Sequence, residues 1–74
     1  MRIEIVRNKD KSWHWRLVAN NNRILAHSET YVKEGSAVNT AMNVAKQARL
    51  KVLKNKRTIA DYTASDISAD NGND

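Results

Sequence analysis

The sequence contains no cysteine, proline or phenylalanine and only two glycines among its 74 residues. The lack of cysteine excludes disulfides and a cysteine nucleophile. Two glycines are too few for a glycine-rich loop that cradles phosphate. No apolar run approaches the roughly 20 residues that span a bilayer, and no segment has the pattern of a signal peptide. We therefore expect a small cytoplasmic protein without a membrane segment.

The short chain limits the hydrophobic core. A domain of this size buries only about 60% of the surface that its unfolded chain exposes. Domains this small often need a disulfide, a metal or oligomerisation, and the disulfide is excluded here. Oligomerisation is therefore one expected source of stability.

Charge is unevenly distributed along the chain. All thirteen Lys and Arg residues lie in residues 1–57, against four acids, and residues 58–74 contain four Asp and no base. The net charge of +5 thus combines +9 in the first part with −4 in the second. A basic body could contact a polyanion, or the acidic end could mask it. A charged surface that only keeps the protein in solution is the simpler explanation.

Three strands are predicted in the first half of the chain. Residues 2–7 and 13–19 alternate apolar and polar side chains, as strands of a half-buried sheet do. Residues 8–12 form a polar turn between them. A second turn is predicted at Asn21-Asn22, because asparagine tolerates the positive φ angles of a two-residue hairpin turn.

This second turn predicts the register of the hairpin. The predicted pairs are Ala19 with Ile24, Leu17 with Ala26, Trp15 with Ser28, Arg16 with His27 and His14 with Glu29. In the first hairpin, Ile5 faces Trp15 and Ile3 faces Leu17. The tryptophans then lie on the apolar face and belong to the core, where they could not stack on exposed bases.

A helix is predicted from the N-cap residue Ser36 to about Leu53. Apolar residues recur in it at helical spacing, from Val38 to Val52. Residues 57–63 regain β character and are predicted to form a fourth strand. One domain, residues 1–63, is expected, followed by a disordered acidic tail, residues 64–74. The class is α+β, with one helix packed on one face of an antiparallel sheet.

The pattern W-x-W-R-L-x-A-x-N, then I-x-A-x-S-E-x-Y, then S-A-x-N at the start of a helix resembles the YegP-like family of small prokaryotic proteins of unknown function. The residues that carry the resemblance are Trp13, Trp15, Arg16, Leu17, Ala19, Asn21, Ile24, Ala26, Ser28, Glu29, Tyr31, Ser36, Ala37 and Asn39. The resemblance covers roughly residues 2–63. Asn22 stands where the family has Gly, and Thr40-Ala41 where it has Gly-Ile.

The resemblance implies a β-β-β-α-β unit that two copies complete. A homodimer would form in which residues 57–63 of each subunit add to the sheet of the other. This expectation agrees with the small size of the core.

The two histidines, His14 and His27, are predicted to lie on the polar sheet face with Arg16 and Glu29. Two His and a Glu could bind a metal, but Arg16 among them would repel a cation. We therefore predict no metal site and no cofactor, and treat these four residues as a polar contact surface. No catalytic relay or carboxylate pair is evident, so no enzyme is predicted.

A run of bases follows the middle of the predicted helix. At helical spacing these bases would lie on its solvent side and could contact nucleic-acid phosphates. Cations near a helix C-terminus are also favoured by its dipole, which needs no ligand. The candidate nucleic-acid contacts are Lys46, Arg49, Lys51, Lys54, Lys56 and Arg57.

Two functions remain open from the sequence. The first is a non-enzymatic homodimer that binds a macromolecule, most simply a protein. The alternative is an accessory protein that binds nucleic acid through the basic run.

Overall fold

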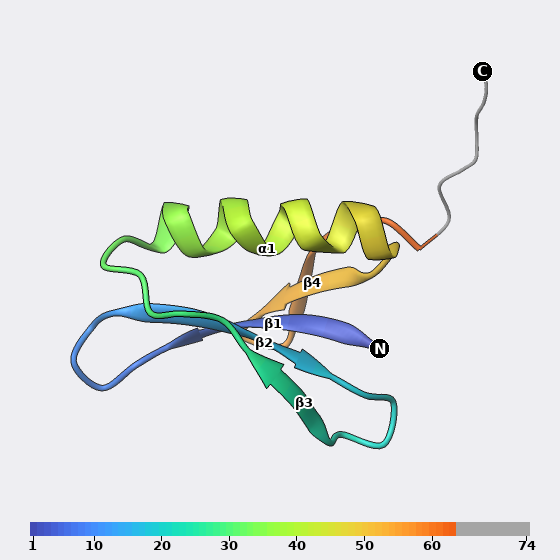
Figure 1. Ribbon diagram of the computed structural model, residues 1–74, viewed down its shortest axis with the longest axis horizontal. Coiled ribbons are helices and arrows are strands. Elements are labelled where there is room, and N and C mark those ends of the chain that lie inside the picture. The colour runs from blue at the N-terminus through green and yellow to red at the C-terminus, as the bar shows by residue number, and fades with distance from the viewer. Residues whose placement is uncertain (64–74) are drawn as a thin grey trace.

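The computed structural model describes residues 1–63 and contains five strands and one helix (Figure 1). The predicted acidic tail, residues 64–74, lies outside the described residues. In chain order the elements are β1 (Arg2–Arg7), β2 (Trp13–Val18), β3 (Ile24–His27), α1 (Glu34–Ala48), β4 (Lys51–Lys54) and β5 (Arg57–Asp61).

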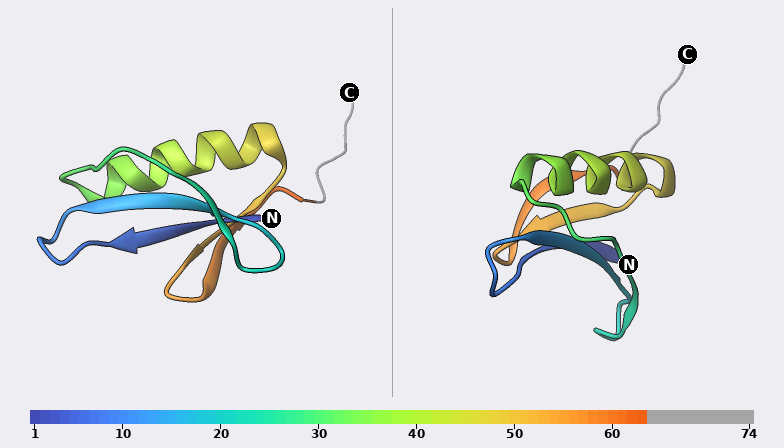
Figure 2. Two further views of the ribbon diagram at one scale, coloured as in Figure 1. Left: turned by 60° about the horizontal axis from the view of Figure 1, so that its bottom comes forward. Right: turned by 60° about the vertical axis from the view of Figure 1, so that its left-hand side comes forward.

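All five strands form one sheet in the order β3-β2-β1-β4-β5. Strands β1 and β4 are parallel, and every other neighbouring pair is antiparallel. After β3 the chain runs past the start of β2 to reach α1, which packs across one face of the sheet and leads into β4, as Figures 1 and 2 show. The predicted α+β class, with one helix on one sheet face, is therefore confirmed. The sheet is mixed instead of antiparallel, because the chain crosses through α1 before β4 pairs with β1.

The first hairpin has the predicted register, with Ile3 opposite Leu17 and Ile5 opposite Trp15. Its turn includes Lys11 at φ 71°, a left-handed conformation.

The second hairpin follows the prediction only in part. Arg16 lies opposite His27 and Leu17 opposite Ala26, as expected. A bulge then places Ile24 opposite Val18 instead of Ala19. The Ala19 amide donates to the Arg23 carbonyl at 2.8 Å, which makes the loop three residues long, with Asn22 at φ 67°. A three-residue loop with its last residue left-handed is a common hairpin connection. The extra residue in the bulge, Leu25, then brings Leu17 and Ala26 back into the predicted register.

The predicted helix boundaries are wrong at both ends. Helix α1 begins at Glu34, and its N-cap, Lys33, makes no side-chain capping bond, so Ser36 is not the N-cap. The helix ends at Ala48, because Arg49 adopts the left-handed conformation at φ 58°. The amide of Leu50 then donates to the carbonyl of Ala45 at 2.9 Å, which closes the last turn.

Residues Lys51–Lys54, after this turn, form β4. The sequence pattern predicts helix for most of this segment, and that prediction is wrong. Val52 is fully buried in β4, opposite Ile3 of β1. A strand inserted between β1 and β5 pairs its backbone on both sides and buries Val52. These contacts outweigh the local helical periodicity.

The predicted fourth strand is β5, which pairs with β4 of the same chain. The two-residue turn Asn55-Lys56 joins them, with φ of 53° and 63°. Pairing of this segment with a second subunit stays a prediction.

The core lies between α1 and the sheet. Three alanines of α1, at positions 37, 41 and 45, are fully buried. Small side chains let the helix approach the sheet closely, and the bulk comes from the strands. Trp13 and Trp15 pack against the core cluster, which confirms their predicted place. Helix α1, the helix in the described residues, is too short and polar to span a membrane.

Candidate functional site

The face of the sheet opposite α1 carries no helix or other element from residues 1–63 (Figure 2). We call it the open face. Strand alternation decides which side chains reach it, because successive residues point to opposite sides. Its central row crosses all five strands. The row comprises His27, Arg16, Glu4, Leu53 and Thr58, paired in that order across β3, β2, β1, β4 and β5.

Glu4 is at the middle of this row and binds two arginines. Its Oε2 accepts from Arg2 Nε at 2.8 Å, and its Oε1 accepts from Arg16 Nε at 2.9 Å. Partial burial alone would raise the pKa of Glu4, but the hydrogen bonds and positive charges of Arg2 and Arg16 outweigh it and hold the pKa below its ordinary value. The carboxylate therefore stays ionised and fixes both guanidinium groups.

The two histidines meet beside this network. The rings of His14 and His27 lie 5.4 Å apart between centroids and are tilted by 52°. His14 Nδ1 is 2.7 Å from Asn8 Oδ1. Partial burial, followed by the positive charges of His27 and Arg16, lowers the pKa of His14. The neutral ring is therefore favoured.

Three of the four predicted sheet-face residues come together, and Glu29 does not join them. Strand β3 ends at His27, and the hydroxyl of Ser28 accepts from the Trp15 amide at 2.9 Å. Tyr31 then forms the next bridge to Trp13, one residue out of register. This shift leaves Glu29 in an exposed connecting segment.

Sequence reasoning missed Glu4 and Arg2 as members of the surface. A signal for Glu4 was present in the predicted first hairpin. If Ile5 faces Trp15 and Ile3 faces Leu17, Glu4 must face Arg16.

The basic run does not form one surface, because only Lys46 lies within the helix. Lys51 alternates to the open face, whereas Lys54 lies on the helix side. There Lys54 pairs with Glu34 and lies 5.4 Å from the Trp13 ring centroid. The candidate contacts occupy four settings: the last helical turn (Lys46), the helix C-cap (Arg49), β4 (Lys51, Lys54), and the turn with the start of β5 (Lys56, Arg57).

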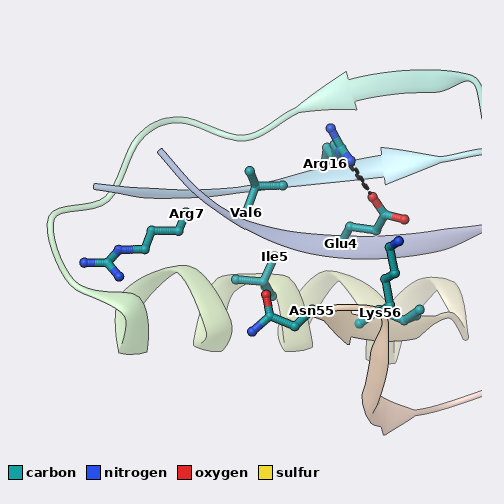
Figure 3. Close-up of a pocket in the computed structure, with 8 residues that line it drawn as sticks. Glu4, Ile5, Val6, Arg7, Arg16, Asn55 and Lys56 are labelled. Carbon is teal, nitrogen blue, oxygen red and sulfur yellow. Dashed lines mark hydrogen bonds and ion pairs between the residues drawn. The ribbon is translucent and has the colours of Figure 1, made fainter. Parts of the chain in front are cut away.

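A hollow of about 390 Å³ opens beside the central row, between β1, β2 and the β4–β5 turn (Figure 3). In Figure 3, Lys56 extends toward Glu4, while Arg7 points away from both. The lining residues are Glu4, Ile5, Val6, Arg7, Arg16, Leu53, Asn55 and Lys56. No cluster of three or more His, Asp or Glu side chains suited to a metal occurs within residues 1–63.

Comparison with protein families gives one match. Residues 8–54 match the family described as domain of unknown function DUF1508. The chain belongs to the DUF1508 family. The YegP-like family is this same domain, so the resemblance seen in the sequence is confirmed. Searches of curated proteins and of solved structures gave no match.

The matched part of this DUF1508 domain runs from the first turn through β4. It includes His14, Arg16 and His27 of the open face but leaves out Glu4 and β5. Chemically, the open face offers the guanidinium groups that Glu4 holds, the imidazole of His14 with its lowered pKa, and a hollow. Such groups suit hydrogen bonding and charge pairing with a partner.

Proposed function

We propose that this DUF1508 domain is a non-enzymatic protein-binding module and that its open sheet face is the contact surface. The observation that carries the proposal is the Arg2–Glu4–Arg16 network at the centre of an uncovered sheet. The network holds two guanidinium groups in place before binding, which lowers the entropic cost of ordering them in an interface. Arginine is also enriched at protein interfaces.

The disposition of the aromatic residues favours a protein over single-stranded nucleic acid. Trp13 and Trp15 pack against the core on the helix side. Tyr31 pairs with Trp13, and Tyr62 packs against the core. The aromatic platforms on which exposed bases usually stack are thus turned away from the open face.

Nucleic-acid binding is the second candidate, with a different observation in its favour. Arg2 and Lys51 are neighbours across β1 and β4 on the open face, beside Arg16. Phosphates could contact these cations without any base stacking. The contact would then use the sheet face instead of the basic run as a whole.

The proposal also includes a homodimer in the cytoplasm. Exposed edge strands support self-association: Leu25 of β3 is 52% exposed and Ile59 of β5 is 41% exposed. Unpaired strand edges with apolar side chains are ready to pair with another chain.

Partner capture from native lysate, with and without nuclease, tests the proposed function. The open-face variant is Thr58→Glu, and the matched control is Gln47→Glu on the outer side of α1; both residues are exposed. We expect captured protein to survive nuclease, to be lost with Thr58→Glu and to be kept with Gln47→Glu. Loss on nuclease treatment would select the nucleic-acid alternative. Equal capture by both variants would contradict the open face as the contact surface.

A further inference from the structure

We propose that the hollow beside Glu4 binds a carboxylate side chain from an acidic segment of the partner protein, with Lys56 and Arg16 as its cationic contacts. This inference rests on the proposed function and adds the chemistry of the partner.

The hollow combines an apolar wall with a polar rim. Val6 and Leu53 supply apolar surface, and Arg16, Asn55 and Lys56 supply donors. At about 390 Å³ the hollow has room for one or two side chains. A glutamate fits this lining, because its methylene groups can pack on the apolar wall while its carboxylate reaches the rim.

The charge of the lining is positive, although Glu4 contributes to it. Both carboxylate oxygens of Glu4 are already held by Arg2 and Arg16. Arg16 uses Nε and one Nη on Glu4, which leaves donors on its other terminal nitrogen. Within residues 1–63, Lys56 has no ion-pair partner. Lys56 therefore brings an unneutralised charge to the rim.

The backbone at Lys56 supplies an independent observation. Lys56 is the second residue of a two-residue turn and has φ of 63°. Glycine is the usual residue at this position, because a side chain there costs free energy. Lys56 therefore destabilises the turn, and a binding role for its charge in the hollow would account for a lysine at this position.

An acidic protein segment fits these observations better than nucleic acid. A backbone of repeated phosphates is contacted by cations spread along a groove, with aromatic side chains for the bases. Here Arg16 and Lys56 converge on one hollow with an apolar wall. One anionic group with an apolar stem matches that geometry.

A nuclear magnetic resonance titration of the full chain, at low salt, tests the inference. The probe is the capped peptide Gly-Leu-Glu-Leu-Glu-Gly, compared with the same peptide carrying Gln for Glu and with a ten-residue thymidine oligonucleotide. We expect the Glu peptide alone to shift the amide signals of Val6, Asn55 and Lys56 to saturation. Binding of the Gln peptide to the same extent, or stronger binding of the oligonucleotide at these amides, would overturn the inference.

Three variants test the role of Lys56. Lys56→Gly removes the charge and relaxes the turn, so we expect a raised melting temperature together with roughly fivefold weaker peptide binding. Lys56→Gln removes the charge and keeps a long side chain, and the same loss of binding is expected. Lys11→Gly is the control, since Lys11 also has positive φ, at 71°, and does not line the hollow. Unchanged binding in both Lys56 variants, or an equal loss in Lys11→Gly, would overturn the inference.

Failure of this inference can be told apart from failure of the proposed function. If lysate capture depends on Thr58 while the Glu peptide does not bind, only the partner chemistry is wrong. If capture is independent of the open face, the proposed function fails as well.

Discussion

At the scale of single residues, Glu4 organises the open face. It belongs to β1, and its two arginines come from β1 and β2, so the network ties neighbouring strands together. Its side chain is 22% exposed, and those of Arg2 and Arg16 are 28% and 34% exposed. Water partly screens ion pairs at this exposure, so these two pairs contribute little to the free energy of unfolding. Their main effect is to hold the side chains of Arg2 and Arg16 in place.

Replacing Glu4 by Gln tests its contribution to stability. The pKa of Glu4 is lowered in the folded protein, so its contribution is complete above its ordinary pKa near 4.5 and is lost as the pH falls through the lowered folded pKa. We expect Glu4→Gln to lose about 1 kcal/mol of unfolding free energy at pH 7 and to show less acid destabilisation below pH 4.5. Urea unfolding across this pH range measures both. Parallel pH profiles would contradict the role of the network.

The histidine pair predicts a second pH effect. Because the pKa of His14 is lowered in the folded protein, His14 binds a proton more readily in the unfolded chain as the pH falls below its ordinary pKa of 6.5. The free energy of unfolding therefore decreases as the pH falls below 6.5. Replacing His27 by Ala removes a neighbouring charge and some cover, and we expect the pKa of His14 to rise. The chemical shifts of the imidazole protons during a pH titration measure the pKa of His14 in both proteins. His14 titrating at the same pH in both proteins would exclude coupling between the rings.

At the scale of elements, the decisive event is the end of the helix at Ala48. Arg49 is left-handed there, and the chain turns back to form β4 beside β1. The left-handed conformation costs a non-glycine residue about 1 kcal/mol or more in free energy. The central position of β4 compensates, because Val52 is fully buried.

Glycine substitutions in this region should act with opposite signs. Arg49→Gly relieves the left-handed residue, so we expect it to raise the unfolding free energy by roughly 0.5–1 kcal/mol. Lys46→Gly, three residues earlier in the last helical turn, should lower it by up to about 1 kcal/mol. Chemical denaturation of both variants measures the difference. Destabilisation of the same size in both would mean that Arg49 makes a contact that outweighs the strain.

At the scale of the whole molecule, residues 1–63 form two layers, one sheet and one helix, and among these residues the outer edges of β3 and β5 have no strand partner. Residues Ile24–His27 of β3 are exposed throughout, and Ile59 is exposed on β5. A small core and open edges together favour association with a second chain.

Mass measurement in solution tests the homodimer. We expect light scattering to give twice the chain mass of 8.4 kDa. If β5 takes part, Ile59→Lys should shift the protein toward the monomer by placing a charge at the edge. Val32→Lys, at a position that is 87% exposed outside the strands, should have no effect. A monomer for the unmodified chain would exclude the dimer at that concentration.

Most of the fold and part of the candidate site could be predicted from local patterns. Alternation in β1 and β2 predicted their faces, and the register brought His14, Arg16 and His27 to one surface. The hairpin bulge and the loss of Glu29 from the surface could not be predicted, because an extra residue in a loop or strand shifts the neighbouring pairs without leaving a local pattern in the sequence.

The sequence by itself determined the α+β class, the apolar face with both tryptophans and the family. These features depend on the spacing of residues within one strand or helix, and that spacing can be read without knowing what the element packs against. Only the tertiary structure decided that residues 51–54 form a central strand, and so where the basic residues lie. Val52 fits either a helix stripe or a sheet interior, and the choice depends on β1, some fifty residues earlier in the chain, which offers a partner edge and a core.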